Sequence, residues 1–232
     1  MDSVYLTGLS YYLPERKLDN SEISQLHPEW SIEKIAHKTG IENRHIAADD
    51  EFVSDMAIAA SNLFFEEYHF DREKIDYIIL CTQSPDYSLP TTACLVQDRL
   101  GLRKDIGAID INLGCSGYIY GLGMAKGLVA TKQARNVLFI TADTYSKIIN
   151  DRDKSNKTLF GDAATATLIS SHIYFPDSTF ELLKFSYGTD GSGFDNLIVK
   201  NSGARKSSSS TNDIEDENGN YITNDSCLYM DG

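Results

Sequence analysis

The sequence predicts an α/β fold in which a mainly parallel sheet is flanked by helices. Two apolar runs, at 77–81 and 135–142, are typical of strands that are covered on both faces. Segments with helical spacing alternate with these strands, and such alternation implies right-handed crossovers between parallel strands. The chain has 232 residues, of which 41% are hydrophobic, so it can bury a substantial core.

The N-terminal elements follow from apolar runs and helix caps. A strand at 4–12 is expected first, followed by short helices at 20–26 and 32–37. Ser31 can cap the second helix, and Gly40 suits the turn after it. The remaining elements are an extended piece at 41–46, a helix at 54–68, a strand at 77–81, a helix at 91–100, a strand at 107–113, a helix from 116 onward, a strand at 135–142, a charged loop at 151–157, a strand ending at 170 and a strand at 180–187.

Composition and charge exclude several classes of protein. A net charge of -13 at pH 7 disfavours nucleic acids and anionic membrane surfaces as partners. The sequence has no run of about 18 apolar residues, and its first residues lack the basic and apolar regions of a signal peptide. The cysteines have no paired spacing, which argues against a zinc site or a disulfide framework and fits the reducing cytosol. They are Cys81, Cys94, Cys115 and Cys227.

Cys115 lies at the join between an expected strand and an expected helix. The positive end of the helix dipole favours a thiolate over a thiol at this place. Gly114 and Gly117 would let the backbone turn sharply and let a substrate come close. These features indicate a nucleophile, whereas a small buried hydrophobe is the common alternative for a free cysteine.

Three more glycines follow inside the expected helix, at 121, 123 and 127. Their spacing differs from the dinucleotide-binding fingerprint, and they do not lie at the start of the helix as that motif requires. We therefore expect them to let the helix pack closely against the sheet.

Five segments of the chain carry a more specific signal when they are taken together. They are 38–46 (KTGIENRHI), 89–94 (LPTTAC), 110–118 (DINLGCSGY), 159–163 (LFGDA) and 187–193 (YGTDGSG). In order and spacing the set resembles beta-ketoacyl-ACP synthase III, the initiating condensing enzyme of the thiolase fold. The resemblance implies a thiolase-like layered fold and a cytoplasmic enzyme of fatty acid biosynthesis.

The same resemblance implies that Cys115 is the nucleophile that accepts an acyl group. The family takes a short acyl group from acyl-CoA onto this cysteine and condenses it with malonyl-ACP, with loss of carbon dioxide. Acyl-CoA and acyl carrier protein would be partners, no cofactor is implied, and a homodimer is expected. A thiolate at a helix terminus suits this chemistry because it attacks a thioester readily.

Three residues are implied as contacts of coenzyme A. Lys38 and Thr39 align with a basic residue and a threonine near the phosphates, and Lys154 aligns with an arginine on one face of the adenine. The tryptophan that usually stacks on the adenine falls at Lys34, because Trp30 lies four residues too early. A solvated surface lysine is the alternative for Lys38 and Lys154.

Leu89 aligns with a bulky residue that, in the family, reaches the acyl pocket of the partner subunit. A leucine there would change the shape of that pocket, and the acyl chain that it favours is left open. The alternative for Leu89 is simple packing within its loop.

Two motifs of the family do not occur in this sequence, namely the His-Gln-Ala-Asn-like and Gly-Asn-Thr-like segments that supply histidine and asparagine for decarboxylation. We therefore expect residues 1–200 to be an N-terminal thiolase-like half that carries the nucleophile. Residues 201–225 would be a flexible polar insertion, and 226–232 would start a truncated connection to an absent C-terminal half. Such a fragment would be catalytically incomplete. Two alternatives stay open: an acyltransferase of the same fold, and a non-catalytic dimerisation or binding module.

Overall fold

The computed structural model describes residues 3–207 and 212–231, and within them two compact units can be distinguished. Each unit is described by itself. The first is formed by residues up to 14, 48–143 and 163–186, and the second by 15–47, 144–162 and from 187 onward. The predicted division at residues 200 and 225 stays a prediction, and residues 208–211 of the predicted polar insertion lie outside the described residues.

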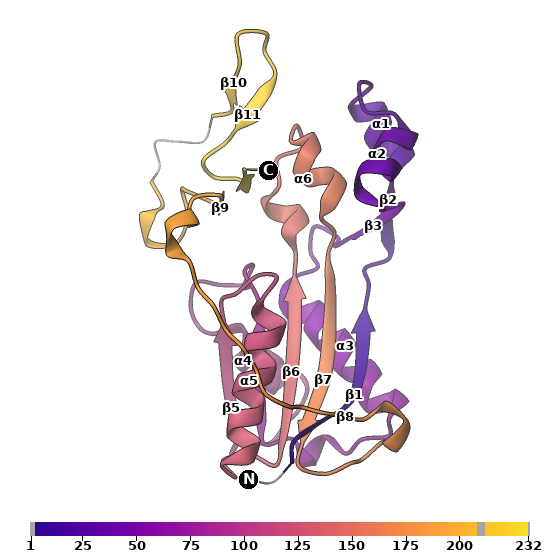
Figure 1. Cartoon of the computed structure of the whole chain (residues 1–232), viewed down its shortest axis with the longest axis vertical. Helices are drawn as coiled ribbons and strands as arrows, with labels where there is room; N and C mark the ends of the chain where they lie inside the picture. Colours follow the sequence, from indigo (N-terminus) through magenta and orange to yellow (C-terminus); the bar gives the residue numbers. More distant parts are fainter. Residues whose placement is uncertain (1–2, 208–211, 232) are drawn as a thin grey trace. The chain divides into compact units, whose positions relative to one another are not determined.

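The first unit is built on a six-stranded sheet with the order β5-β4-β6-β7-β1-β8 (Figure 1). The strands β4, β5 and β6 are parallel to one another, whereas β7 is antiparallel to both β6 and β1. The bounds are β1 Tyr5–Tyr12, β4 Tyr77–Cys81, β5 Gly107–Ile111, β6 Asn136–Asp143, β7 Ala163–Ser170 and β8 Phe180–Glu181.

The α/β fold with flanking helices is confirmed, but the sheet is mixed and not mainly parallel. The strands β6 and β7 pair along their whole length in antiparallel register, from Asn136 opposite Ser170 to Asp143 opposite Ala163. A central strand that is buried on both faces is apolar throughout, whatever the direction of its neighbours. The apolar runs therefore indicated strands but carried no information about their direction.

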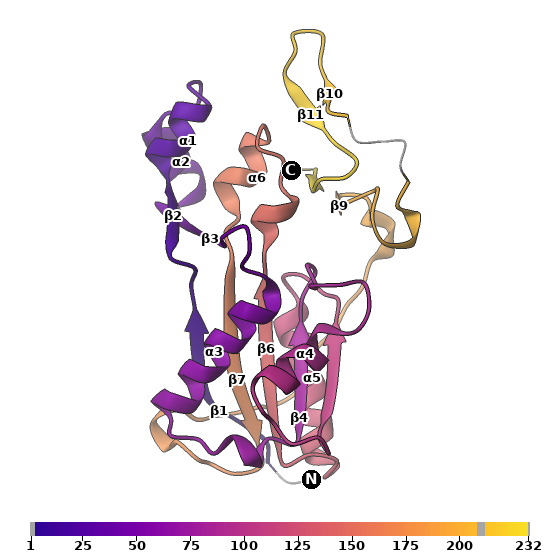
Figure 2. The same cartoon turned by 180° about the vertical axis from the view of Figure 1, so that it is seen from behind.

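The three helices of the first unit cover both faces of the sheet. α3 (Val53–Glu67) and α4 (Thr92–Arg99) lie on one face, and α5 (Gly117–Ala130) lies on the other (Figures 1 and 2). The crossover from β4 to β5 runs toward the edge of the sheet, and the crossover from β5 to β6 runs back past β4. Two right-handed crossovers in opposite directions place their helices on opposite faces.

The predicted close packing of α5 is confirmed at Gly121. A Cβ atom at this position would lie 2.1 Å from the ring of Phe139, which is fully buried in β6. Around this contact, Leu122, Ala125 and Val129 of the helix pack on the buried sheet residues. By contrast, a Cβ atom at Gly127 would meet nothing within 4 Å, so the close approach is local to the first half of the helix.

The second unit consists of short elements. Its helices are α1 Asn20–Leu26, α2 Ile32–Thr39 and α6 Lys154–Leu159, and its strand pairs are β2 Arg16–Asp19 with β3 Asn43–Ile46, β9 Leu197–Ile198 with β12 Tyr229–Met230, and β10 Ile214–Glu215 with β11 Tyr221–Thr223. The 3₁₀ turns of the two units are Arg72–Lys74, Tyr145–Ile148, Pro176–Ser178, Gly191–Gly193 and Gly203–Arg205. Among the described residues, no helix combines the length and the apolar character that a membrane span requires.

Local signals account for both ends of α2, whereas the end of α6 depends on a residue that is distant in the sequence. The predicted caps of α2 are confirmed, since the Ser31 hydroxyl accepts a hydrogen bond from the Lys34 N–H and Gly40 adopts a left-handed conformation with φ of 68°. Arg44 is 3% exposed and donates from Nε to the carbonyl oxygen of Thr158 at 2.9 Å. This contact satisfies a carbonyl group in the last turn of α6, where a cation is favourable.

Two predicted elements differ from the structure. The charged loop expected at 151–157 contains the start of α6, because the Asp153 carboxylate caps that helix by accepting from the Asn156 N–H at 3.1 Å. The segment has no apolar periodicity, so only its cap could have revealed the helix. The strand expected at 180–187 is confined to Phe180–Glu181.

Replacing Gly121 by alanine tests the close packing of α5. We expect Gly121→Ala to lower the free energy of unfolding by about 1–3 kcal/mol, because the added methyl group would collide with the buried Phe139 ring. Gly127→Ala in the same helix is the matched control, and we expect it to raise the free energy of unfolding by up to about 1 kcal/mol through helix propensity. Urea denaturation followed by circular dichroism measures both. Equal effects of the two substitutions would contradict the packing described here.

Candidate active site

Cys115 lies between the end of β5 and the start of α5, and its side chain is exposed. The carboxyl ends of β4, β5 and β6 lie together at this end of the sheet because the three strands are parallel. In open α/β sheets, ligands bind outside the carboxyl ends of the strands where the crossovers change direction. The alternative of a small buried hydrophobe is therefore wrong for Cys115.

The backbone around Cys115 forms a tight turn that leads into α5. The Gly117 N–H donates to the Gly114 carbonyl oxygen at 2.8 Å, and the N–H groups of Ile119 and Tyr120 donate to the carbonyl oxygen of Ser116. No described residue accepts a hydrogen bond from the Cys115 N–H. That N–H is therefore a donor without an acceptor among the described residues, and it belongs to the same residue as the exposed sulfur.

The two glycines that flank this turn act through their size. Neither Gly114 nor Gly117 has a positive φ, so the expected sharp backbone turn is not the reason for glycine. A Cβ atom at Gly117 would lie 2.4 Å from the sulfur of Cys81, and one at Gly114 would lie 2.6 Å from Oε1 of Gln83. The glycines thus let the turn settle directly onto the end of β4.

Cys81 packs against the turn from the end of β4. It is 3% exposed, and its S–H donates to the carbonyl oxygen of Leu113 at 3.2 Å. Burial, together with the negative charge of Asp143, raises the pKa of the Cys81 thiol to about 11. At neutral pH Cys81 is therefore a protonated, inert thiol, in contrast to the exposed Cys115.

The sequence analysis missed the contributions of Cys81, Gln83 and Asp143 to this site. Cys81 and Asp143 each end a buried strand, and Gln83 follows the first of these strands by two residues. Polar side chains at the carboxyl ends of neighbouring parallel strands meet at one edge of the sheet. This rule could have found all three residues, had the order of the strands been known.

Leu89 lies in the loop that joins β4 to α4 of the first unit, and its side chain is 82% exposed. Packing within its own loop is therefore wrong as an account of this residue. The helix that follows is fixed by Asp110 of β5, whose two carboxylate oxygens accept from the N–H groups of Thr92 at 2.7 Å and Ala93 at 2.8 Å. An exposed leucine thus sits on a loop whose far end is firmly anchored.

The other predicted contact residues belong to the second unit. The Nζ atoms of Lys38 and Lys34 lie 5.2 Å and 5.1 Å from the centroid of the Trp30 ring, so this tryptophan is covered by two lysines. The hydroxyl group of Thr39 donates to the Ile35 carbonyl oxygen at 2.9 Å and accepts from the Ile41 N–H at 3.1 Å. Thr39 therefore closes the end of α2 with its side chain.

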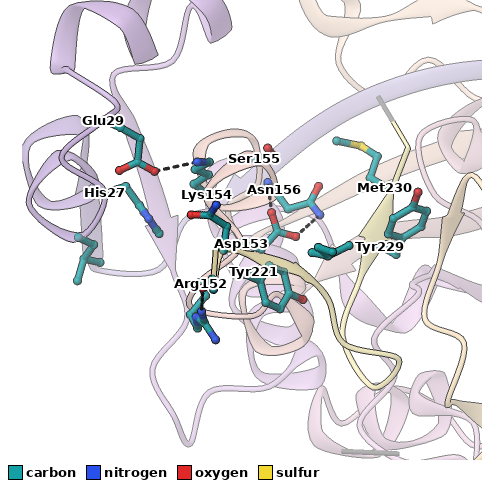
Figure 3. Close-up of a pocket in the computed structure, with 14 residues that line it drawn as sticks. His27, Glu29, Arg152, Asp153, Lys154, Ser155, Asn156, Tyr221, Tyr229 and Met230 are labelled. Atoms are coloured by element: carbon teal, nitrogen blue, oxygen red, sulfur yellow. Dashed lines mark hydrogen bonds and ion pairs between the residues drawn. The ribbon is translucent and has the colours of Figure 1, made fainter. Parts of the chain in front are cut away.

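Lys154 lines a pocket of about 360 Å³ in the second unit (Figure 3). Its ammonium group forms an ion pair with Glu29 at 2.8 Å, and this hydrogen bond lowers the pKa of the Glu29 carboxyl. Arg152 beside it pairs with Asp213 at 3.3 Å and Glu215 at 2.5 Å. Both cations of the pocket are thus matched by carboxylates, so the pocket carries no surplus of positive charge.

Metal chemistry has no support in the part of the chain that the structure describes. No group of three or more histidine, cysteine, aspartate or glutamate side chains there could hold a metal ion. The four cysteines are free thiols and lie apart in the sequence. Among the described residues at the carboxyl ends of these strands, Cys115 is an exposed thiol that lies just before a helix.

The layered α/β fold of the first unit agrees with the family to which the comparisons assign the chain. A family model for 3-oxoacyl-[acyl-carrier-protein (ACP)] synthase III matches residues 109–191. A crystal structure of a 3-oxoacyl-(acyl-carrier-protein) synthase III superposes with a TM-score of 0.89 at 45% identity, over 99% of this chain and 68% of that one. The chain therefore belongs to the beta-ketoacyl-ACP synthase III family, as the sequence analysis predicted.

Curated relatives agree with this assignment. The beta-ketoacyl-[acyl-carrier-protein] synthase III of Caldanaerobacter subterraneus is 40% identical over 200 residues, which are 86% of this chain and 59% of that protein. The enzyme of the same name from Sulfurovum sp. is 36% identical over 217 residues, which are 93% of this chain and 62% of that protein. Across the curated relatives compared, the chain spans between 54% and 64% of their length.

Proposed function

We propose that the chain takes part in the synthesis of a beta-ketoacyl-ACP, with Cys115 as the residue that accepts the acyl group. The Cys115 thiolate attacks the carbonyl carbon of an acyl-CoA thioester, the Cys115 N–H stabilises the resulting oxyanion, and the thiolate of coenzyme A leaves. A new thioester at Cys115 replaces the old one, so no oxidant and no cofactor is needed. The exposed sulfur beside an N–H group that has no acceptor among the described residues is the observation that supports this proposal.

The second step would join the acyl group to malonyl-ACP with loss of carbon dioxide, in the manner of a decarboxylative Claisen condensation. This step needs a histidine and an asparagine near the acylated cysteine. In the first unit, His69 follows the end of α3 and His172 follows the end of β7, where Ser170 pairs with Asn136 at the start of β6. Both histidines therefore lie near the amino ends of the parallel strands, whereas Cys115 lies at their carboxyl ends. Because the sequence also lacks the His-Gln-Ala-Asn-like and Gly-Asn-Thr-like segments, we infer that these 232 residues by themselves carry out the acyl transfer without the condensation.

Lys38, Thr39 and Lys154 are proposed as the contacts of coenzyme A. Lys38 and Lys154 would meet its phosphate or adenine groups, because both lysines have ammonium groups on the surface of the second unit. Thr39 would act indirectly, since its hydroxyl group holds the end of α2 and thereby places Lys38. Leu89 is proposed to reach the acyl pocket of a partner subunit, which its high exposure allows.

A homodimer is proposed, with β5 as the strand that pairs across the interface. β5 is the last strand of its sheet, and Ile109 on this strand is 36% exposed. An edge strand with an exposed apolar residue is a template for pairing with another chain. Acyl carrier protein is proposed as the second partner, and the free cysteines support a reducing compartment such as the cytoplasm.

Acylation of Cys115 is the decisive test of the proposed function. Incubation with acetyl-CoA or octanoyl-CoA should add one acyl group to the protein, detected by intact-mass analysis, and Cys115→Ala should abolish the adduct. Cys94→Ala is the matched control, because Cys94 is another exposed cysteine of the first unit, and this variant should be acylated like the wild type. Absence of an adduct with every thioester would refute the proposal. Steady formation of a beta-ketoacyl product from malonyl-ACP would instead show that the 232 residues also condense.

The role of the lysines is tested by comparing two acyl donors. We expect Lys38→Met and Lys154→Met each to lower the rate of Cys115 acylation by acetyl-CoA about 3- to 10-fold, because each removes one charged contact with the nucleotide. Acetyl-pantetheine lacks the nucleotide, so its rate should not change. Lys17→Met, an exposed lysine of β2, is the control. An equal loss with both donors would assign the lysines to the folding of the second unit.

The oligomer proposal is tested at the edge strand. We expect Ile109→Lys to convert a dimer into a monomer, because a charge on the edge strand opposes pairing with a second copy. Sedimentation velocity of both proteins at equal concentration measures the outcome. A wild-type chain that sediments as a monomer at micromolar concentration would exclude β5 pairing.

A further inference from the structure

Asp143 has an unusual set of hydrogen bonds at the carboxyl ends of the parallel strands, close to Cys115. It is the last residue of β6, and its Oδ1 atom accepts from four donors: the Thr82 hydroxyl at 3.1 Å, the Gln83 N–H at 2.7 Å, the Ser84 N–H at 3.1 Å and the Ser84 hydroxyl at 2.9 Å. Two of these donors are backbone N–H groups of consecutive residues. A single oxygen atom thus fixes the path of the chain just after β4.

The burial of the Asp143 carboxylate is energetically unfavourable. Burial raises the pKa of the Asp143 carboxyl, and the hydrogen bonds from Gln83, Ser84 and Thr82 offset only part of that effect. Among the ion pairs of the described residues, none involves Asp143. A partly buried carboxylate without a cation therefore depends on its hydrogen bonds to remain stable in this place.

The segment that Asp143 holds in place, residues 81–84, contacts the turn that carries Cys115. Gln83, which it binds through the backbone, has its side-chain Oε1 against Gly114, at 2.6 Å from where a Cβ atom would lie. Thr82 donates its N–H to the Ile111 carbonyl oxygen at the end of β5 at 3.1 Å. Segment 81–83 therefore touches residues on the strand side of Cys115 at three positions, including the Leu113 carbonyl oxygen bound by Cys81.

The same segment also touches the helix side of the turn. The sulfur of Cys81 would lie 2.4 Å from a Cβ atom at Gly117, the first residue of α5. Contacts at Gly114 and Gly117 thus bracket Cys115 from both directions. A shift of segment 81–84 would move both contacts and with them the Cys115 sulfur and N–H.

We propose that Asp143 is a positioning residue for Cys115, which acts through its hydrogen bonds to Thr82, Gln83 and Ser84. Asp143 does not touch the substrate and transfers no proton. Its oxygen keeps segment 81–84 in place, and that segment keeps the sulfur and the N–H of Cys115 aligned for attack on a thioester. This inference rests on the proposed role of Cys115 as the acylated residue.

The test separates the oxygen acceptor from the charge of Asp143. Asp143→Ala removes the acceptor, and we expect the rate of Cys115 acylation by acetyl-CoA to fall about 10- to 100-fold, because misplacement of reacting groups by about 1 Å has that effect. The loss should appear in the rate constant of acylation at saturating acetyl-CoA, and the acetyl-CoA concentration that gives half of that rate should not change. Asp143→Asn retains an amide oxygen that can take the place of Oδ1, so its rate should stay within about threefold of the wild type.

Two further proteins keep the test decisive. Ser61→Ala removes a fully buried hydroxyl group that bonds the Ala57 carbonyl oxygen in α3, so it perturbs the same unit without touching segment 81–84, and its acylation rate should match the wild type. Should Asp143→Ala fail to fold by circular dichroism, the double variant Thr82→Val/Ser84→Ala removes the two hydroxyl donors to Asp143, and with the Thr82 hydroxyl a second acceptor of the Ser84 N–H. We expect that variant to acylate about 3- to 10-fold more slowly.

Alkylation of Cys115 by iodoacetamide, followed by peptide mass mapping, is measured in parallel on each protein. If Asp143→Ala is acylated by acetyl-CoA at the wild-type rate, the inference is overturned. Where the alanine variant does not fold, a wild-type acylation rate of the double variant has the same consequence. An Asn variant as slow as the Ala variant would also overturn the inference, because the charge would then matter and the acceptor would not. If the wild type takes no acyl group from any thioester, the proposed function fails, and the iodoacetamide rates still decide the positioning role.

Discussion

The first unit depends on one steric constraint, the close approach of α5 to the sheet. Gly117 and Gly121 are four residues apart, so they lie on the same face of the helix, and that face rests on Cys81 of β4 and Phe139 of β6. A methyl group at either position would push the helix outward. Because Cys115 lies two residues before the helix begins, the seating of α5 also fixes the position of the sulfur at the sheet edge.

This constraint explains why two cysteines at the same end of the sheet lie in different environments. Cys81 lies beneath the turn, where burial raises its pKa to about 11, whereas Cys115 lies above the turn and is exposed. The peptide groups of α5 point their N–H ends toward Cys115. No described residue accepts a hydrogen bond from the Cys115 N–H in the turn. The environments of the two thiols thus support a structural role for Cys81 and the proposed nucleophilic role of Cys115.

Local signals in the sequence predicted the elements that depend on local physics. The apolar run of β4 was predicted at Tyr77–Cys81, where the structure has it, and the Ser31 and Gly40 caps of α2 were also correct. The direction of β7 was not predictable, because a strand buried on both faces is apolar in either direction. α6 was missed because it has no apolar stripe and begins at a single capping carboxylate, that of Asp153.

The candidate site divides in the same way between local and distant determinants. The position of Cys115 before a helix was readable from the sequence, whereas the partner of Lys154 was not, because Glu29 lies 125 residues away. The distant partner changes what the lysine can do. An exposed ion pair of this kind is worth about 1 kcal/mol or less, so an arriving phosphate group can draw Lys154 away at little cost. Glu29 then remains beside that phosphate as an anion, because the ordinary pKa of a glutamate carboxyl lies well below neutral pH. An aligned lysine therefore offers a weaker hold on a nucleotide than its charge alone would suggest, because its carboxylate partner repels the same ligand.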